Sequence, residues 1–191
     1  MKKDRLIALT DAVLAIIMTI LILELEKPET PSLQAFWELR HNFFAYFLSF
    51  FWLGSLWMAL NTLWEKVERI SSEVVWANLY LLFFVSFMPY ATGLVSSHFE
   101  NYTAQLFYGS VVIVSTIINW YLHKVLDKPN QDQVELLKET ETYRKLLIPD
   151  ILIKCVGFIL ALIIYPPIMM YSVLAAAAYI IPLKTIKEKK K

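Results

Sequence analysis

Apolar positions along this chain are grouped in long runs that short polar segments separate. The hydrocarbon core of a bilayer is about 30 Å thick, and a helix that crosses it needs roughly 20 apolar residues. Runs that approach this length cover residues 6–25, 43–63, 74–96, 104–125, 146–165 and 167–183. The pattern predicts an all-α integral membrane protein with six transmembrane helices in a single domain, residues 1–191.

The fifth and sixth runs are separated only by a very tight turn at Tyr165-Pro166-Pro167. Proline lacks a backbone N–H and disfavours helix at the residue before it, so we expect the fifth helix to end there. A single kinked re-entrant element is the alternative. Residues 126–145 are polar, and we interpret them as a cytoplasmic linker with a short amphipathic helix, Asp132–Lys145. We interpret its charged residues as a solvated helix face, in preference to a regulatory site.

Positive charge tests the crossings independently, because Lys and Arg concentrate in short cytoplasmic loops. With the N-terminus inside, six crossings place 15 of the 18 Lys and Arg residues on the cytoplasmic side, including the basic tail Lys184–Lys191. Lys27 and Arg40 fall outside, and Lys154 lies within the fifth run. Five crossings would put the basic tail outside. We therefore predict a multi-pass protein of the plasma membrane with both termini in the cytoplasm.

Composition supports membrane embedding. The chain is 58% hydrophobic and 18% charged, with a mean hydropathy of +0.51, which is too apolar for an ordinary soluble domain. A net charge of +1 gives no reason to expect a nucleic-acid partner. The first run contains Asp11 and is followed by acidic residues rather than a small-residue cleavage site, so we interpret it as a helix of the mature protein and not as a signal peptide.

Motifs for enzymes and cofactors are missing from the sequence. It contains no HExxH, no GxSxG, no phosphate-binding loop and no glycine-rich carbonyl filter. The single Cys155 excludes an internal disulfide and a Cys-based metal site. His41, His98 and His123 are scattered near predicted helix ends, where interfacial positions are favoured over metal ligation. The sequence predicts neither an enzyme nor a cofactor.

Asp11 lies inside the first predicted helix, where an ionisable side chain is costly and indicates a function or a partner. Arg5 is about 240° away around that helix and is a poor partner. We expect Asp11 to bond a neighbouring helix, with ion binding as the alternative. The candidate donors are Trp57, Trp76 and Asn78.

Lys154 is the other ionisable residue within an apolar run, and Asp150 lies one helical turn before it. An acid and a lysine at this spacing can form an ion pair on one helix face. The long apolar stem of lysine can also carry the ammonium group to the membrane interface. We favour snorkelling to the cytoplasmic interface.

The first predicted helix carries two adjacent stripes when its residues are placed about 100° apart. Small residues that permit close helix approach form one stripe: Ala8, Ala12, Ala15 and Thr19. Bulky branched residues form the other: Leu9, Ile16, Ile20 and Leu23. Periodicity alone favours a lipid-facing or core role for the bulky stripe.

Two sequence blocks resemble a known family. Arg5-x-x-x-Leu9-Thr10-Asp11 resembles the R-x-x-x-F-S-D motif of the lysosomal and prokaryotic potassium channels of the transmembrane protein 175 family, with conservative departures at Leu9 and Thr10. The third run, Asn78-Leu79-x-x-Leu82-x-x-x-Ser86-x-x-Pro89-x-x-Thr92, is similar to the family pattern N-L-x-x-L-x-x-x-S-x-x-P-x-x-T. The resemblance covers the first half of the chain. It departs after Trp57, where the family often carries His.

The resemblance implies a potassium channel without a re-entrant filter loop, in which the first helices of four subunits surround one pore. It implies an apolar constriction at Ile16, a hydroxyl ring at Thr19 near which potassium ions pass, and further apolar layers at Ile20 and Leu23. A ring of branched side chains can gate a pore by dewetting. The residues expected to anchor the helices around this pore are Arg5, Asp11, Trp57, Trp76 and Asn78.

The leading hypothesis is passive potassium conduction through a homotetramer in a lipid bilayer. Glu24, Glu26 and Glu29 would raise the local cation concentration at the outer mouth, although salt screens exposed charges beyond about 8 Å. The competing hypothesis is a proton-coupled secondary transporter that uses Asp11 and Lys154 as protonation sites. An accessory membrane scaffold without transport is the third hypothesis.

Overall fold

Helices account for nearly all of the regular structure in the computed structural model, which describes residues 2–188 and the side chains of residues 2–180. The elements are α1 (Lys3–Ile20), the 3₁₀ turn η1 (Leu21–Glu24), α2 (Leu33–Glu38), α3 (Arg40–Lys66), α4 (Ser72–Val85), α5 (Met88–Ser97), α6 (Tyr102–Val125), the 3₁₀ turn η2 (Lys128–Asn130), α7 (Val134–Ile163) and α8 (Ile168–Glu188). The predicted all-α fold is confirmed for the described residues.

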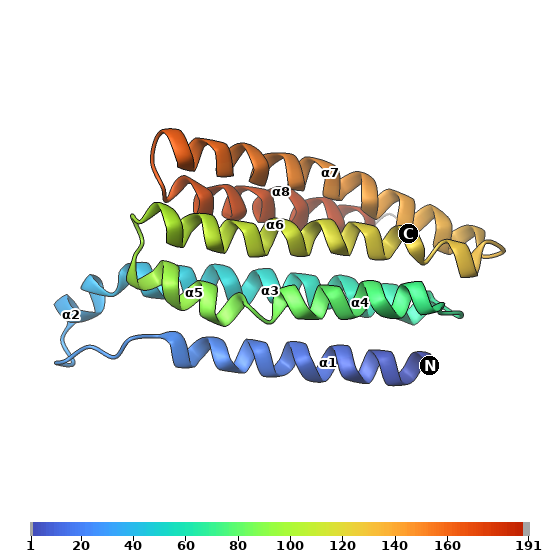
Figure 1. Ribbon diagram of the computed structural model, residues 1–191, viewed down its shortest axis with the longest axis horizontal. Helices are drawn as coiled ribbons and strands as arrows, with labels where there is room; N and C mark the ends of the chain where they lie inside the picture. The colour runs from blue at the N-terminus through green and yellow to red at the C-terminus, as the bar shows by residue number, and fades with distance from the viewer. Residues whose placement is uncertain (1, 189–191) are drawn as a thin grey trace.

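The long helices lie side by side, roughly along one axis, with α1 at one edge of the bundle (Figure 1). Next to α1 come α3 and the collinear pair α4 and α5, then α6, and finally the antiparallel hairpin of α7 and α8. Helix α1 packs against α3 and α4, while α6 packs against α4, α5 and α7. One long side of α1 is therefore left without a partner from the other described helices.

Within the described residues, five segments are long and apolar enough to cross a membrane: Lys3–Glu24, Arg40–Lys66, Ser72–Ser97, Tyr102–Asn130 and Val134–Ile163. The sixth predicted run, 167–183, corresponds to α8, whose described apolar part is the shorter segment Ile168–Ile180. The side chains of the basic tail Lys184–Lys191 lie outside the described residues. Helices α7 and α8 are two separate antiparallel helices, so the single kinked element considered from the sequence is not formed.

The predicted third helix, 74–96, is interrupted in the structure. Helix α4 ends at Val85 and α5 begins at Met88, with Pro89 in its first turn. Proline cannot donate the helical hydrogen bond to the carbonyl four residues before it, so a helix that reaches Pro89 from α4 would lose that bond. A new helix accepts proline in its first turn, where the N–H has no helical partner in any case. The prediction of one continuous helix over residues 74–96 is therefore wrong at residues 86 and 87, where α4 and α5 are separated.

The predicted linker over residues 126–145 is also corrected. Helix α7 runs from Val134 to Ile163 without a break, so the expected amphipathic helix and the fifth transmembrane helix are one element. Its buried residues recur at intervals of three, four or seven positions, one or two helical turns, across the predicted boundary: Leu136, Thr140, Leu147, Asp150, Lys154, Gly157 and Ala161. A single helix face thus packs on its neighbours over the whole length.

Polar contacts tie the loops at one end of the bundle. Lys3 Nζ donates to the carbonyl of Val67, the residue that caps the end of α3, at 2.6 Å. Arg69 pairs with Asp132, and this hydrogen bond holds the pKa of the Asp132 carboxyl below its ordinary value. A lowered carboxyl pKa means that the pair stabilises the fold at neutral pH and that this contribution is lost as the pH falls through the lowered pKa.

Helices α7 and α8 approach closely at Gly157. A Cβ atom at this position would overlap Oγ and Cβ of Ser172 on α8, and Ser172 is buried with its hydroxyl donated to the carbonyl of Met169. We expect Gly157→Ala to lower the stability of the folded protein by about 1–3 kcal/mol, the range for overpacking a close-packed contact. The measurement is thermal unfolding in detergent.

Gly54→Ala is the matched control for Gly157→Ala. A Cβ atom at Gly54 would meet only Cε of Met18, at 3.8 Å, an ordinary contact. Alanine is also the better helix former by about 1 kcal/mol, so this variant should be as stable as the parent protein or more so. Equal losses in both variants would contradict the close approach of α7 to α8.

Candidate functional site

The side of α1 that faces away from the bundle carries the predicted pore residues. Buried residues on the opposite side of the span fix the orientation of the helix: Leu6, Thr10, Leu14, Ile17 and Leu21. Ile16 is 57% exposed and Leu23 is 78% exposed, and Ile20 and Thr19 are exposed as well. These four side chains share one face that has no partner among the described residues of this chain.

Thr19 is the polar group on this face. Its hydroxyl donates to the carbonyl of Ile16 at 2.8 Å, as threonine hydroxyls in helices often do toward the preceding turn. Because the hydroxyl hydrogen is used within the helix, the oxygen lone pairs are left to accept. An outward hydroxyl oxygen of this kind can contribute to the coordination of a hard cation such as K⁺.

The 3₁₀ turn η1 continues the exposed face beyond Ile20. In a 3₁₀ helix residues three apart are eclipsed, so Leu23 falls directly in line with Ile20. Glu24, at the end of η1, lies against α5, because a Cβ atom at Gly93 would overlap its carboxylate. Ser97 Oγ, at the end of α5, donates to Glu26 Oε1 at 2.9 Å. Two of the three acidic residues expected at this mouth are thus held against α5.

Asp11 is held by the neighbouring helix α3. Trp57 Nε1 donates to Asp11 Oδ1 at 2.9 Å, so the indole is the partner among the donors considered from the sequence. Trp76 is 59% exposed and packs against Tyr80, and Arg5 forms no ion pair with another described residue. The structure therefore brings Trp57 to Asp11 but leaves Arg5 and Trp76 apart from it.

Thr10 provides a second anchor, which the sequence reasoning did not assign. Asn78 Nδ2 on α4 donates to Thr10 Oγ1 at 2.8 Å, and the Thr10 hydroxyl donates to the carbonyl of Leu6 at 2.8 Å. Both side chains are buried. Adjacent residues of α1 thus bond two different helices, with Thr10 fixed to α4 and Asp11 fixed to α3. The adjacent polar pair Thr10-Asp11 was the available signal.

Replacing Trp57 by Phe should remove the hydrogen bond to Asp11 while keeping an aromatic ring. Hydrogen bonds to charged groups contribute about 1.5–3 kcal/mol when buried, and we expect roughly 1 kcal/mol here because Trp57 is part-exposed. Trp37→Phe is the matched control, since the Trp37 indole is exposed and has no hydrogen-bond partner among the described residues. Thermal unfolding of the two variants measures the difference, and equal stabilities would contradict an anchoring role for Trp57.

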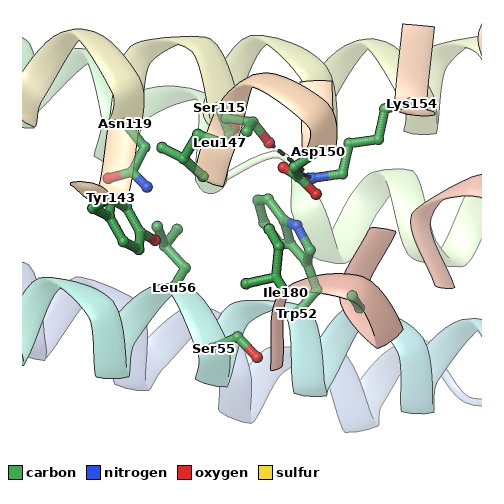
Figure 2. Close-up of a pocket in the computed structure, with 12 residues that line it drawn as sticks. Trp52, Ser55, Leu56, Ser115, Asn119, Tyr143, Leu147, Asp150, Lys154 and Ile180 are labelled. Atoms are coloured by element: carbon green, nitrogen blue, oxygen red, sulfur yellow. Dashed lines mark hydrogen bonds and ion pairs between the residues drawn. The ribbon is translucent and has the colours of Figure 1, made fainter. Parts of the chain in front are cut away.

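Lys154 does not snorkel to the interface, and that expectation is wrong. Its side chain is buried, with 2% of the residue exposed, and its Nζ donates to Asp150 Oδ2 at 2.6 Å and to Thr116 Oγ1 at 3.1 Å (Figure 2). A partner one turn away and a hydroxyl on α6 satisfy the ammonium group inside the bundle. This pair lies on α7, on the opposite side of the bundle from α1.

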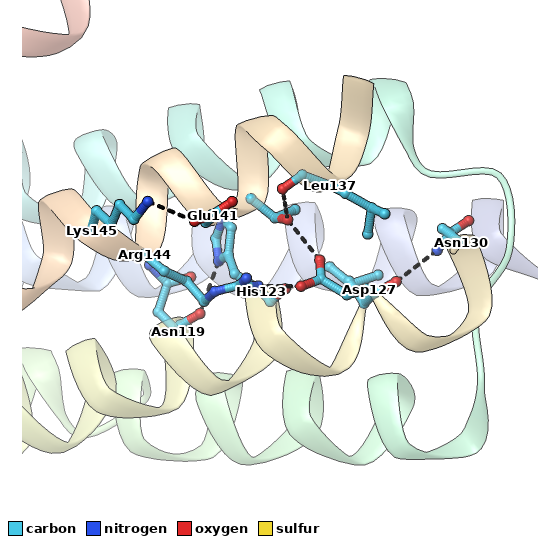
Figure 3. Close-up of polar contacts among 10 residues, drawn as sticks. Asn119, His123, Asp127, Asn130, Leu137, Glu141, Arg144 and Lys145 are labelled. Carbon is cyan, nitrogen blue, oxygen red and sulfur yellow. Dashed lines mark hydrogen bonds and ion pairs between the residues drawn. The ribbon is translucent and has the colours of Figure 1, made fainter. Parts of the chain in front are cut away.

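His123 lies near the end of α6, as expected, and it is buried against α7. Its ring stacks on Tyr143 with centroids 4.4 Å apart, and its Nδ1 lies 2.9 Å from the carbonyl of Asn119. Figure 3 shows it within a polar cluster between α6 and α7, in which Arg144 bonds both the His123 carbonyl and Asp127. This cluster explains why the polar first half of α7 packs on α6 rather than forming a free linker.

The fold and the α1 face define a class of protein. A bundle of apolar helices buries Asp150 and Lys154 as a pair and leaves a branched apolar face with one hydroxyl on its first helix. This arrangement is typical of a multi-pass membrane protein in which the exposed face of the first helix contacts a partner or the bilayer.

Comparison with known proteins identifies the family. Residues 5–89 match the family described as the endosomal/lysosomal potassium channel TMEM175. A potassium channel of Chryseobacterium sp. is 41% identical over 128 residues, which cover 66% of each chain. The chain belongs to the TMEM175 family. The family match runs from α1 to the start of α5, and it contains the first sequence motif and the second motif as far as Pro89.

More distant relatives and a solved structure agree with this assignment. A potassium channel of Streptomyces collinus is 25% identical over 104 residues, covering 52% of this chain and 50% of its own. The endosomal/lysosomal proton channel TMEM175 of Gallus gallus is 28% identical over 133 residues, covering 63% of this chain and 26% of its own. The chain therefore spans two thirds or less of the length of these curated relatives.

The fold itself matches a crystal structure. A lysosomal potassium-selective channel TMEM175 homolog from Chamaesiphon minutus superposes with a TM-score of 0.77 at 20% identity, covering 93% of this chain and 95% of that one. At this identity the match concerns the fold alone. It extends the likeness to α6, α7 and α8, which the family match does not reach.

Proposed function

We propose that the protein is a passive potassium channel in which four copies of the chain surround one pore lined by α1. The observation that carries the proposal is the unpartnered α1 face, on which Ile16, Thr19, Ile20 and Leu23 lie together in a chain of a channel family. One helix cannot enclose a pore, so conduction through this face requires assembly. The relatives from Chryseobacterium sp. and Streptomyces collinus are both named potassium channels, which supports the choice of ion.

Each residue of the face has a proposed role. Ile16 forms the narrow apolar constriction, where a ring of branched side chains excludes water from the closed pore. Thr19, one turn further, offers hydroxyl oxygens to potassium ions that are partly hydrated. Ile20 and Leu23 form wider apolar layers toward the outer mouth. Glu24 and Glu26, held against α5, raise the cation concentration there.

The anchors give this face its rigidity. Thr10 and Asp11 fix α1 to α4 and α3 about one to two turns before Ile16, so the constriction is presented by a helix whose rotation is set on its buried side. Arg5 and Trp76 are proposed to complete the anchoring motif in the assembled protein. The proposed orientation has six crossings and both termini in the cytoplasm of a plasma membrane, in accord with the distribution of Lys and Arg.

Potassium flux tests this function directly. The purified protein in potassium-loaded vesicles should carry a current that rises linearly with driving force, and native mass spectrometry should find four subunits. Absence of potassium flux under every gradient would overturn the channel proposal. A monomer or dimer that conducts would overturn the pore geometry while leaving conduction intact.

Proton coupling is the second candidate, and the buried pair Asp150–Lys154 is the observation that favours it. Intramembrane ionisable pairs occur in proton relays, and the relative from Gallus gallus is named a proton channel. A carrier that uses Asp11 and Lys154 predicts saturable flux that depends on a pH gradient. A channel instead predicts a current that rises with driving force without saturating. This current persists when the pH is equal on the two sides of the membrane.

A further inference from the structure

A partly open cavity lined by both apolar and polar side chains lies in the bundle, away from the α1 face. Residues of α3, α6, α7 and α8 line it, and Figure 2 shows Asn119 and Tyr143 toward one end and the pair Asp150 and Lys154 toward the other. Ser115 lies between these ends, and the Trp52 ring lies beside the Asp150–Lys154 pair, with its centroid 5.9 Å from Lys154 Nζ. The mechanism proposed for conduction uses none of these residues.

Two polar atoms in this cavity lack a hydrogen-bond partner among the described residues. They are Ser115 Oγ and Asn119 Oδ1, one turn apart on α6, and their side chains are 1% and 3% exposed. Lys154 uses two of its three ammonium protons, on Asp150 and Thr116. A buried polar atom without a partner is costly, and natural proteins usually satisfy such atoms with protein groups or ordered water.

The chemistry of the lining selects the occupant. Asp150 and Lys154 neutralise each other, so the cavity offers no uncompensated charge to a free cation or anion, while an apolar ligand would leave the hydroxyl of Ser115 and the carbonyl of Asn119 unsatisfied. Water both donates and accepts, and suits a lining of this mixed kind. The space open to the centres of water molecules is about 60 Å³, and one water needs about 10–15 Å³ of such space.

We propose that this cavity is an internal binding site for a small cluster of water molecules that bridges the Asp150–Lys154 pair to Ser115 and Asn119. The cluster keeps the buried pair hydrated, satisfies the unpartnered atoms of α6 and joins α6 to α7. The site is separate from the α1 face and does not depend on potassium conduction.

Transfer of magnetisation from water to asparagine side chains tests the site in the intact protein. The full chain, labelled with ¹⁵N-asparagine, is placed in lipid vesicles, and solid-state NMR follows the build-up of signal from water protons to each side-chain amide. The Asn119 signal is assigned as the one lost in Asn119→Ala. We expect the build-up at Asn119 to be several-fold faster than at Asn78, which is also buried but lies outside this cavity.

A cavity-filling variant sharpens the result. Ser115→Leu should displace the water and slow the Asn119 build-up to the rate at Asn78, whereas Thr62→Leu on the exposed face of α3 should leave it unchanged. Slow build-up at Asn119 in the unaltered protein would overturn the proposal, whether or not Ser115→Leu folds. Fast build-up that Ser115→Leu leaves unchanged would also overturn it, because the water would then lie elsewhere.

Discussion

Lys154→Met is expected to lower the stability of the folded protein by about 3–5 kcal/mol, the range for removing one partner of a buried ion pair. The variant would leave the Asp150 carboxylate buried with no cation beside it. Met keeps the length and the apolar stem of the lysine, so the loss of packing is small. Thermal unfolding in detergent measures the effect.

Two further variants give this prediction its controls. Lys145→Met removes a lysine from an ion pair with Glu141 that has the same i, i+4 spacing on the same helix but is exposed, and it should leave stability nearly unchanged because solvent screens exposed pairs. Adding Asp150→Asn to Lys154→Met removes the unpaired charge and should recover much of the loss. Equal losses for Lys154→Met and Lys145→Met would contradict burial of the inner pair.

Ile16→Asn is expected to raise potassium flux through the reconstituted protein. An amide ring at the proposed constriction binds water, so it removes the free-energy barrier that a dewetted apolar ring opposes to ions. The expected result is a larger leak at every driving force, measured as potassium efflux from loaded vesicles. Assembly should be unaffected, because Ile16 is not part of the buried side of α1.

Ile159→Asn is the matched control for this substitution. Ile159 is 54% exposed, close to the 57% of Ile16, but it lies on α7, at the opposite edge of the bundle from α1. The same chemical change there should leave flux unchanged. An unchanged flux in Ile16→Asn, or an equal rise in both variants, would remove Ile16 from the pore.

The sequence predicts the long helices well, because apolar runs of bilayer length are rare outside membrane-spanning helices. It predicts two boundaries poorly. Pro89 was visible in the third run, but proline within a membrane helix can also produce a kink, so the start of a new helix was not evident. In α7, charges near Glu141 and Lys145 suggested a solvated linker. Only the recurrence of Leu136, Thr140 and Leu147 on one face indicates a continuous helix.

The candidate site was also predicted only in part from the sequence. The rule that a membrane acid needs a partner predicted that Asp11 bonds another helix and left three candidate donors, of which the structure pairs Trp57 with it. The bond between Thr10 and Asn78 was not assigned, because a threonine hydroxyl can bond within its own helix and so does not require a partner on another helix. The burial of Lys154 depends on Thr116 facing it from α6, and the rotation of α6 about its axis cannot be read from a sequence.

The contact between Glu24 and Gly93 constrains how this chain can vary. The carboxylate, the flexible end of the Glu24 side chain, occupies the space that a Cβ atom on Gly93 would need. A methyl group gained at Gly93 would turn this carboxylate away from α5. Alanine at the Gly93 position would therefore change the direction of the acid at the outer mouth without altering the backbone of α1.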